Sequence, residues 1–438
     1  MAINSNVKFA TFNVSFAHDN DPTENFQQWV DFMQMPPARQ SALIAKWKNQ
    51  SATASEVKLA ERIIQIRNVA AIIQKNRPDV LLLNEFNNDG IGEDKRAIAG
   101  FHSNYLQVAQ SLNSVDGGNL LAPITYPFME SYATNTGLAS GVDLTRNGYD
   151  PQDPNDAYGF GYYHGHYAFA LFSKFAIDTE NTRTFQGFKR KDLPGVTKPV
   201  VNVCTLEKPL PANVACGDNW FTEAAWQQLR LSSKNHVDAP IQIPTAAGSI
   251  TLHVLLSHPT PPAFDTFSDN NKIRNSEENA FWQYYIGGEA KLYDDAGIHG
   301  GFRGDYFVIM GDLNADAYFS TGTDSRFAGL RRLMQDEHVH QEVSAVTGKF
   351  APTSMGGKNE GNPGQHPFPQ SRTSTFGARA DYCVPSANLT VRETGVYWPS
   401  EGEAGRRLIN DTRLGERGSD KEVSSDHRLV WVTIALDQ

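Results

Sequence analysis

A short apolar run that ends abruptly in polar residues is the feature that most limits how this chain can fold. Residues 307–310, Phe-Val-Ile-Met, show no alternation of apolar and polar side chains, which is typical of a strand covered on both faces. Gly311 then permits a tight turn, and Asp312 and Asn314 follow it two positions apart. One of these side chains can hold a water molecule or a cation while the other donates a hydrogen bond to a phosphate oxygen. The run therefore predicts a buried strand with a functional pair at its end, with a plain strand and turn as the alternative.

Other apolar runs of the chain also carry polar side chains at their ends. These runs, each of which predicts a strand, cover residues 7–13, 79–85, 166–173, 250–258, 380–384 and 425–434. The polar residues at or beside the strand ends are, in chain order, Asn13, Glu85, His258, Asp312, Asn314, Asp381 and His427. One such residue alone would most simply be a turn former or a hydrogen-bonded structural histidine. Seven of them predict that the strand ends converge on a polar site.

Stretches with helical spacing of apolar residues lie between the strands. The clearest covers residues 55–75, where Ser55 is the expected N-cap and Arg77-Pro78 ends the helix. Weaker patterns predict one or two short helices within residues 23–48, and one helix in each of 220–231 and 275–290. The sequence has no repeat and no boundary linker, so we expect one large domain over residues 1–438 rather than two.

Two long segments lack any periodic pattern. Residues 113–165 are rich in turn formers and tyrosine, which predicts an ordered insertion without regular structure, and residues 353–379 predict a long surface loop. The first segment contains five side chains that could bind a structural Ca²⁺, namely Asp143, Asn147, Asp150, Asp153 and Asp156. They do not follow the helix-loop-helix calcium pattern, so solvated turn carboxylates are the favoured interpretation.

The charge of the chain limits its partners. A formal net charge of −10 argues against a nonspecific grip on long nucleic acid, which depends on many Lys and Arg contacts to phosphates. It is compatible with a smaller phosphate substrate, because a divalent cation can supply positive charge locally. No apolar run approaches the length needed to cross a bilayer, so we expect no transmembrane segment.

The three cysteines favour an exported protein. Cys204 and Cys216 lie twelve positions apart in a segment of turn formers and predict a disulfide that closes a surface loop, whereas Cys383 lies in an expected strand and predicts a buried thiol. Disulfides are stable mainly outside the cytosol, so we expect a secreted or periplasmic protein. The first residues show no signal-peptide pattern, which implies that an exported form has lost its leader.

The motifs at the strand ends carry a resemblance to a known family. With Gly-Asp-Leu-Asn at 311–314, Ser-Asp-His at 425–427 and Asn-Glu at 84–85, the chain resembles the endonuclease/exonuclease/phosphatase superfamily. The Asn-Glu pair departs from the family's usual Gln-Glu. The resemblance covers nearly the whole chain and implies an α+β, deoxyribonuclease I-like fold, in which two β-sheets pack face to face as a sandwich flanked by helices. The strand-rich pattern is compatible with that architecture.

The resemblance also implies a metal-dependent reaction. The expected activity is hydrolysis of a phosphoester by water at a Mg²⁺-type site, with Mn²⁺ or Ca²⁺ as alternatives. Glu85 is expected to coordinate the metal, helped by Asn13 and Asp426, because hard cations prefer oxygen ligands.

Five further residues receive catalytic roles by the same matching of motifs. Asp312 is expected to orient or deprotonate the attacking water, and Asn314 to bind a phosphate oxygen. His427 is expected to contact the scissile phosphate with its ring held by Asp381. His258 is expected to stabilise developing charge or to protonate the leaving oxygen.

Other polar residues in the loops between the strands are candidates for binding the substrate, since loops on a rigid scaffold commonly carry specificity. They are His166, Lys191, Lys234 and His236, with His164 and Asn235 beside them. For each one, a solvated charge or a turn residue is the alternative.

Three classes of function remain open. The favoured one is a phosphatase or phosphodiesterase that acts, as a monomer, on small or lipid-derived phosphates. A secreted nonspecific nuclease is the alternative, but it should show a basic track, and the sequence has only the cluster 189–191. A phosphate-binding protein without catalysis is disfavoured because every motif carboxylate and histidine is present. Segments 191–195, 230–234 and 256–262 resemble secreted bacterial members of the family, which agrees with export.

Overall fold

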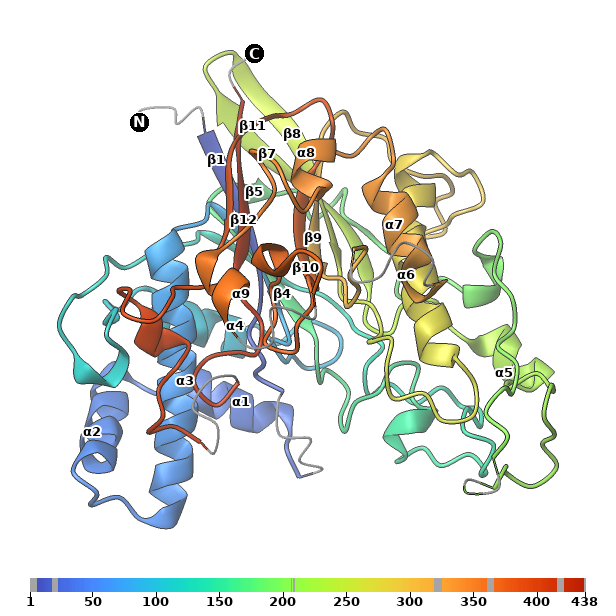
Figure 1. The fold of residues 1–438 in the computed structure, drawn as a ribbon, viewed down its shortest axis with the longest axis horizontal. Coiled ribbons are helices and arrows are strands. Elements are labelled where there is room, and N and C mark those ends of the chain that lie inside the picture. Colours follow the sequence, from blue (N-terminus) through green and yellow to red (C-terminus); the bar gives the residue numbers. More distant parts are fainter. Residues whose placement is uncertain are drawn as a thin grey trace.

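Two β-sheets packed against each other form the centre of the protein (Figure 1). We analysed a computed structural model, which describes residues 6–17, 23–205, 207, 209–318, 325–360, 366–415 and 421–436. Within these ranges each sheet has six strands, and helices lie outside them.

The first sheet joins the two ends of the chain. Its strand order is β11-β12-β1-β2-β4-β3. The central strand β1 runs parallel to β2 and antiparallel to β12. The bounds are β1 (Asn6–Asn13), β2 (Val80–Asn84), β3 (Phe128–Ser131), β4 (Phe169–Ser173), β11 (Thr390–Val396) and β12 (Val430–Ala435).

The second sheet is built from the middle of the chain. Its order is β10-β9-β8-β7-β5, and β6 also pairs with β7. The pair β8 and β9 is parallel, whereas β10 runs antiparallel to β9. The bounds are β5 (Ala176–Ile177), β6 (Arg183–Thr184), β7 (His236–Thr245), β8 (Gly248–Ser257), β9 (Phe307–Asp312) and β10 (Asp381–Pro385).

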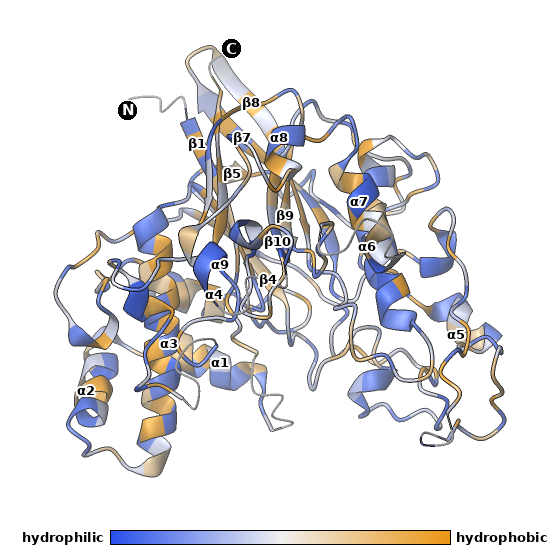
Figure 2. Cartoon of the chain, in the orientation of Figure 1, coloured by the Kyte–Doolittle hydropathy of each residue, from blue (hydrophilic) through white to orange (hydrophobic). Residues whose placement is uncertain are grey.

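The two sheets meet through β1 and β2 on one side and β9 and β10 on the other. The apolar residues of these strands are almost completely buried. Figure 2 shows much of the two facing sheets as hydrophobic. Burial of this continuous apolar surface is the main stabilising contribution to the sandwich. The predicted α+β sandwich flanked by helices is therefore confirmed.

A helix lies in each stretch for which the sequence predicted one, and four further described α-helices lie outside those stretches. The described α-helices are α1 (Phe26–Met33), α2 (Pro37–Lys48), α3 (Ala54–Asn76), α4 (Arg96–Phe101), α5 (Glu223–Gln228), α6 (Asn270–Ile286), α7 (Ala328–Met334), α8 (Gln341–Ser344) and α9 (Met355–Asn359). The predicted N-cap Ser55 was wrong, because Thr53 accepts a hydrogen bond from the Glu56 amide while Glu56 accepts one from the Thr53 amide. This reciprocal capping box places the start of α3 two residues earlier than predicted.

The two long segments are more regular and more buried than predicted. Residues 113–165 include β3, whose pairing with β4 makes a strand out of residues without a strong pattern of their own. Residues 353–379 include α9, and Thr373, Ser374 and Arg379 within them are fully buried. The expected surface loop is therefore wrong for those residues, because this segment packs against the end of β10; residues 361–365 lie outside the described part.

Two acidic side chains of segment 113–165 accept hydrogen bonds from backbone amides of the same segment. Asp156 is 1% exposed and accepts hydrogen bonds from the amides of Leu144 and Asp150. Asp143 likewise accepts from the amides of Arg146 and Gly148. The favoured interpretation as turn carboxylates fits these contacts, although Asp156 is buried rather than solvated.

Both predictions for the cysteines are confirmed. Cys204 and Cys216 form a disulfide with a Cα–Cα distance of 5.9 Å. Cys383 is a buried free thiol on β10. Among the described helices, none has both the length and the apolar character needed to span a membrane.

Candidate active site

The ends of strands from both sheets converge on one polar cluster. In the second sheet, the antiparallel register places Asp312, the last residue of β9, directly opposite Asp381, the first residue of β10. In the first sheet, the parallel register of β1 and β2 places Asn13 opposite Asn84, so that Glu85 follows at the same edge. Because β1 contacts β9 and β10, the two edges meet.

Asn13 links two of the acids across the sheets. Its amide nitrogen lies 3.0 Å from Oε1 of Glu85 and 2.9 Å from Oδ2 of Asp312, and it donates to both. Its amide oxygen accepts from the Ser15 backbone. In this arrangement Asn13 spaces the two carboxylates and lies beside Glu85, the residue expected to coordinate the metal.

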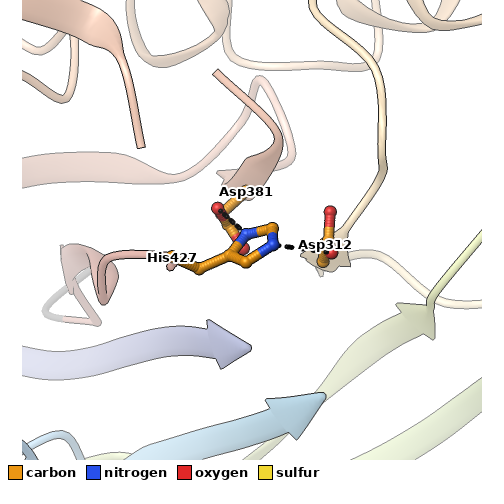
Figure 3. Close-up of side chains that lie close together, drawn as sticks. All are labelled: Asp312, Asp381 and His427. Atoms are coloured by element: carbon orange, nitrogen blue, oxygen red, sulfur yellow. Dashed lines mark hydrogen bonds and ion pairs between the residues drawn. The ribbon is translucent and has the colours of Figure 1, made fainter. Parts of the chain in front are cut away.

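His427 lies between two aspartates (Figure 3). Its Nδ1 atom is 2.9 Å from Oδ2 of Asp381, and its Nε2 atom is 3.6 Å from Oδ2 of Asp312. Thr373 donates a further hydrogen bond of 2.7 Å to the same Asp381 oxygen. Asp381 therefore fixes the ring, and the opposite nitrogen is directed toward Asp312.

The electrostatics of this group keep its members charged. Burial lowers the pKa of His427, but the charges of Asp381 and Asp312 outweigh it and raise that pKa well above the ordinary value. Burial raises the pKa of Asp312, but His427 and His258 outweigh it and hold this pKa below the ordinary value. The geometry thus favours an imidazolium beside an ionised carboxylate.

His258 approaches the same carboxylate from the end of β8. Its Nε2 atom is 3.4 Å from Oδ2 of Asp312, and the residue is 3% exposed. Its Nδ1 atom has no hydrogen-bond partner among the described residues. Burial lowers the pKa of His258 to about 4, so this ring is neutral at pH 7 while His427 is charged.

Asn314 completes the motif that follows β9. Its backbone amide donates to Oδ1 of Asp312 at 2.9 Å, which orients that carboxylate. Its side-chain nitrogen donates to the carbonyl of Pro259 at 3.0 Å, so one hydrogen of the amide is already used. Asn314 adopts a φ of 50°, a left-handed conformation that Asn tolerates and that allows the chain to turn here.

Two serines without a predicted role of their own connect Asp426 to the end of β1. The Ser15 hydroxyl donates to Oδ1 of Asp426 at 2.5 Å and lies 2.7 Å from the hydroxyl of Ser425. Ser425 donates in turn to the carbonyl of Asn13 at 2.6 Å. Ser425 is the first residue of the Ser-Asp-His motif at 425–427, whereas no motif includes Ser15.

Comparison with known proteins agrees with this geometry. The model of the endonuclease/exonuclease/phosphatase family matches residues 10–427. The chain belongs to this family. Members are typically hydrolases of phosphoester bonds and generally depend on a divalent metal. A comparison with curated proteins gives no match.

Several solved structures are similar at low identity. An endonuclease/exonuclease/phosphatase from Beutenbergia cavernae DSM 12333 is 14% identical over 98% of this chain and 72% of its own, with a TM-score of 0.40. A family protein from Leptotrichia buccalis C-1013-b is 13% identical over 98% and 99%, with a TM-score of 0.41. The catalytic domain of human nocturnin with bound sulfate is 10% identical over 99% and 96%, with a TM-score of 0.38.

The acidic residues of this family member fit a hard divalent cation. Burial raises the pKa of Glu85 to about 7, and the charge of Asp426 acts in the same direction. Oδ1 of buried Asp381 has no hydrogen-bond partner among the described residues. Ligand atoms of Asp312, Asp381 and His427 lie within 4.8 Å of one another. Oxygen-rich groups of this kind suit Mg²⁺ better than softer metals.

Lys234 and His166 extend the site of this family member. Lys234 is 6% exposed, and no described residue forms a hydrogen bond or ion pair with its ammonium. Burial lowers the pKa of Lys234, an effect that Glu278, Glu85 and Asp312 oppose. His166 is 1% exposed, its Nε2 atom lacks a described partner, and its pKa is lowered to about 3 by burial and next by Lys234.

Other predicted substrate-binding residues are engaged in contacts with the protein itself. Both ring nitrogens of His236 are used, with Nδ1 2.5 Å from the Ser232 hydroxyl and Nε2 2.8 Å from the carbonyl of Glu278. Lys191 lies 3.0 Å from Asp192 in the chain segment before β7. The side-chain contacts of His164 and Asn235 are to backbone groups of the loops near β3 and β6. The described contacts therefore do not bring these residues into the cluster.

Proposed function

We propose that this protein is a metal-dependent phosphoester hydrolase in which water attacks a phosphate held between the ends of the two sheets. The observation that carries the proposal is the buried His427, which is oriented by Asp381 and directed toward Asp312. A carboxylate-oriented imidazole beside a second carboxylate provides a cation for phosphate oxygens and an acceptor for a water proton in one place.

Asp312 is assigned to the attacking water. Its low pKa keeps it ionised, and an ionised carboxylate accepts hydrogen bonds only, so it can orient the attacking water by accepting a hydrogen bond from it. Asn13, Asn314 and the two histidines surround it and fix its direction. Such preorganisation lowers the cost of reaching the transition state.

The phosphate is assigned to the groups that carry positive charge or free donor atoms. His427 contacts a phosphate oxygen as an imidazolium, and the remaining amide hydrogen of Asn314 contacts another. Lys234 is close enough to Glu85 and His258 to interact with them electrostatically. The Lys234 ammonium and Nε2 of His166 are available to bind an anionic group. His258 is assigned to the leaving oxygen, where its neutral ring can donate a hydrogen bond to the developing charge.

Glu85 and Asp426, with the neighbouring Asn13, would hold a Mg²⁺-type cation, with Mn²⁺ or Ca²⁺ as alternatives. When bound, the cation supplies positive charge that polarises the phosphate and stabilises charge developing on its oxygens. Relief of the repulsion between the two carboxylates would favour its binding.

A small phosphate monoester or diester is favoured over nucleic acid as the substrate. The cluster 189–191 is engaged internally: Lys189 donates to the carbonyl of Gln228, Arg190 pairs with Glu277, and Lys191 pairs with Asp192. It therefore does not offer a free basic track for long nucleic acid, and the net charge of −10 points the same way.

We further infer that the chain is one domain, acts as a monomer and is exported, with the disulfide as the support for export. Size-exclusion chromatography with light scattering tests the monomer, and limited proteolysis tests the single domain.

The activity is tested with pure protein and Mg²⁺, Mn²⁺ or Ca²⁺ against a nitrophenyl phosphate monoester, the corresponding diester and plasmid DNA. We expect metal-dependent turnover of a nitrophenyl ester that a chelator abolishes. Efficient plasmid nicking at low enzyme concentration would favour the nuclease alternative, and no turnover of any of the three would favour a phosphate-binding protein.

A further inference from the structure

Helix α6 presents an unusual face to the interior. The buried side chains on this face are polar or carry a polar atom, and they recur at helical spacing: Arg274, Asn275, Glu278, Asn279 and Trp282. Each of them forms a hydrogen bond with a chain segment outside the helix. Core-facing helix stripes are ordinarily apolar, so this pattern calls for an explanation other than packing.

The segments that α6 binds are those that carry the candidate site. Trp282 donates to the Ser257 hydroxyl at 2.9 Å, one residue before His258. Asn275 donates to the carbonyls of Leu313 and Asn314 at 3.1 and 3.2 Å, just after β9. The helix thus contacts the segment that leads into His258 and the segment that directly follows Asp312.

Glu278 joins two of these segments directly. Its Oε1 atom accepts from the Ser233 amide at 2.6 Å, and its Oε2 atom accepts from the Thr260 amide at 2.6 Å. Ser233 is the neighbour of Lys234, and Thr260 lies two residues after His258. One 1%-exposed carboxylate therefore holds the backbones on which both side chains are mounted.

The bonding pattern makes Glu278 difficult to replace. Hydrogen bonds from backbone amides to an ionised carboxylate are stronger than those between neutral groups, and a buried amide without an acceptor is costly. A glutamine has one acceptor oxygen and one amide group, so it can satisfy only one of the two backbone amides and directs its own donor at the other.

We propose that Glu278 is a positioning residue that fixes the distance between His258 and Lys234, and that the polar face of α6 is the template on which the site segments are assembled. The inference rests on the proposed hydrolase function for its kinetic consequence, but its structural consequence is independent of that function. A displacement of about 1 Å at a site of this kind can lower the rate about 100-fold.

The neighbouring residue provides a matched control. Glu277 is also a largely buried carboxylate of α6, but it pairs with Nε of Arg190 at 2.5 Å, away from the site segments. We therefore compare Glu278→Gln with Glu277→Gln. Glu278→Asp keeps the charge but is too short to reach both amides, and it serves as a second variant if Glu278→Gln does not fold.

Two readouts separate positioning from general stabilisation. At a temperature where every variant is folded, we expect Glu278→Gln to lower kcat for a nitrophenyl ester about 10- to 100-fold with a smaller change in KM, and Glu277→Gln to leave both near wild type. In NMR spectra, we expect the ring signals of His258, assigned by their loss in His258→Asn, to move in Glu278→Gln and not in Glu277→Gln.

Equal effects of the two glutamine variants, or an unchanged kcat and unchanged His258 signals in Glu278→Gln, would overturn the proposal. If the wild-type protein has no turnover, the hydrolase function fails while the NMR comparison still decides the role of Glu278.

Discussion

Nδ1 of His427 lies 2.9 Å from Oδ2 of Asp381, and both residues are almost completely buried. Such a pair fixes the tautomer and direction of the imidazole and stabilises its charged form. Asp381→Asn preserves the size of the side chain and removes the charge. We expect kcat to fall on the order of 1000-fold by analogy with other carboxylate-oriented histidines, while the fold is kept.

Another Asp–His pair in the chain, with a buried aspartate and a partly buried histidine, controls for that test. Asp238 lies 2.6 Å from Nδ1 of His253 on β7 and β8, outside the cluster. Asp238→Asn should alter the melting temperature and leave kcat close to wild type. Equal losses of kcat in both variants would mean that Asp381 acts through stability alone.

Lys234 is expected to strengthen binding of the phosphate ester at a cost to the stability of the fold. A buried ammonium without a partner is costly, so Lys234→Met should raise the free energy of unfolding by about 1 kcal/mol. The same change should raise KM for a phosphate ester about tenfold, because it removes a charge-assisted contact worth about 1.5 kcal/mol.

The matched variant for that experiment is Lys191→Met. Lys191 pairs with Asp192, so its replacement should leave KM unchanged. Chemical denaturation and initial-rate kinetics measure both quantities. A weaker fold together with an unchanged KM in Lys234→Met would refute the assigned role.

His236 makes the fold sensitive to acid. Burial lowers its pKa from 6.5 to about 4 in the folded protein, so the unfolded chain takes up a proton below pH 6.5 that the folded chain takes up only near pH 4. Stability should therefore fall as the pH drops through this window, by about 3 kcal/mol from this residue. His236→Gln should be less stable at pH 7 but show a shallower loss between pH 6.5 and 4 in urea unfolding. Parallel pH profiles for the two proteins would contradict the assignment.

The disulfide should stabilise the fold under oxidising conditions. It closes a loop with a sequence separation of 12, for which the loss of unfolded-state entropy corresponds to about 3 kcal/mol. A reductant should lower the melting temperature of the wild-type protein and leave that of the Cys204→Ser, Cys216→Ser double variant unchanged. An equal drop in melting temperature in both proteins would contradict this prediction, because the reductant would then act at a site other than the disulfide.

The parts of the fold with strong local signals could be predicted from the sequence. The strand-prone stretches at 7–13, 79–85, 250–258 and 307–310 predicted β1, β2, β8 and β9, and the polar residues at their ends predicted much of the cluster around Asp312. Short β3 could not be predicted in this way, because its pairing with β4 decides its conformation. The spacing of Thr53 and Glu56 matches a capping box, which indicates Thr53 rather than Ser55 as the N-cap.

The site contacts that were missed depend on distant backbone groups. Ser15 binds Asp426 across almost the whole length of the chain, and Glu278 binds two amides that no sequence pattern connects to it. His236 and Lys191 were predicted from their positions between strands to bind the substrate. In the structure, His236 instead contacts Ser232, and Lys191 pairs with Asp192. Loop position indicates where function can lie and leaves the direction of each side chain open.

The most direct test of the proposed function is the ratio of kcat/KM between wild type and Asp312→Asn with a nitrophenyl phosphate ester and Mg²⁺. Asparagine keeps the shape of the side chain and removes the charge that we assign to the attacking water. We expect the ratio to reach at least about 1000, with a circular dichroism spectrum like that of the wild-type protein. Near wild-type turnover by Asp312→Asn would contradict the proposal that this carboxylate activates the water.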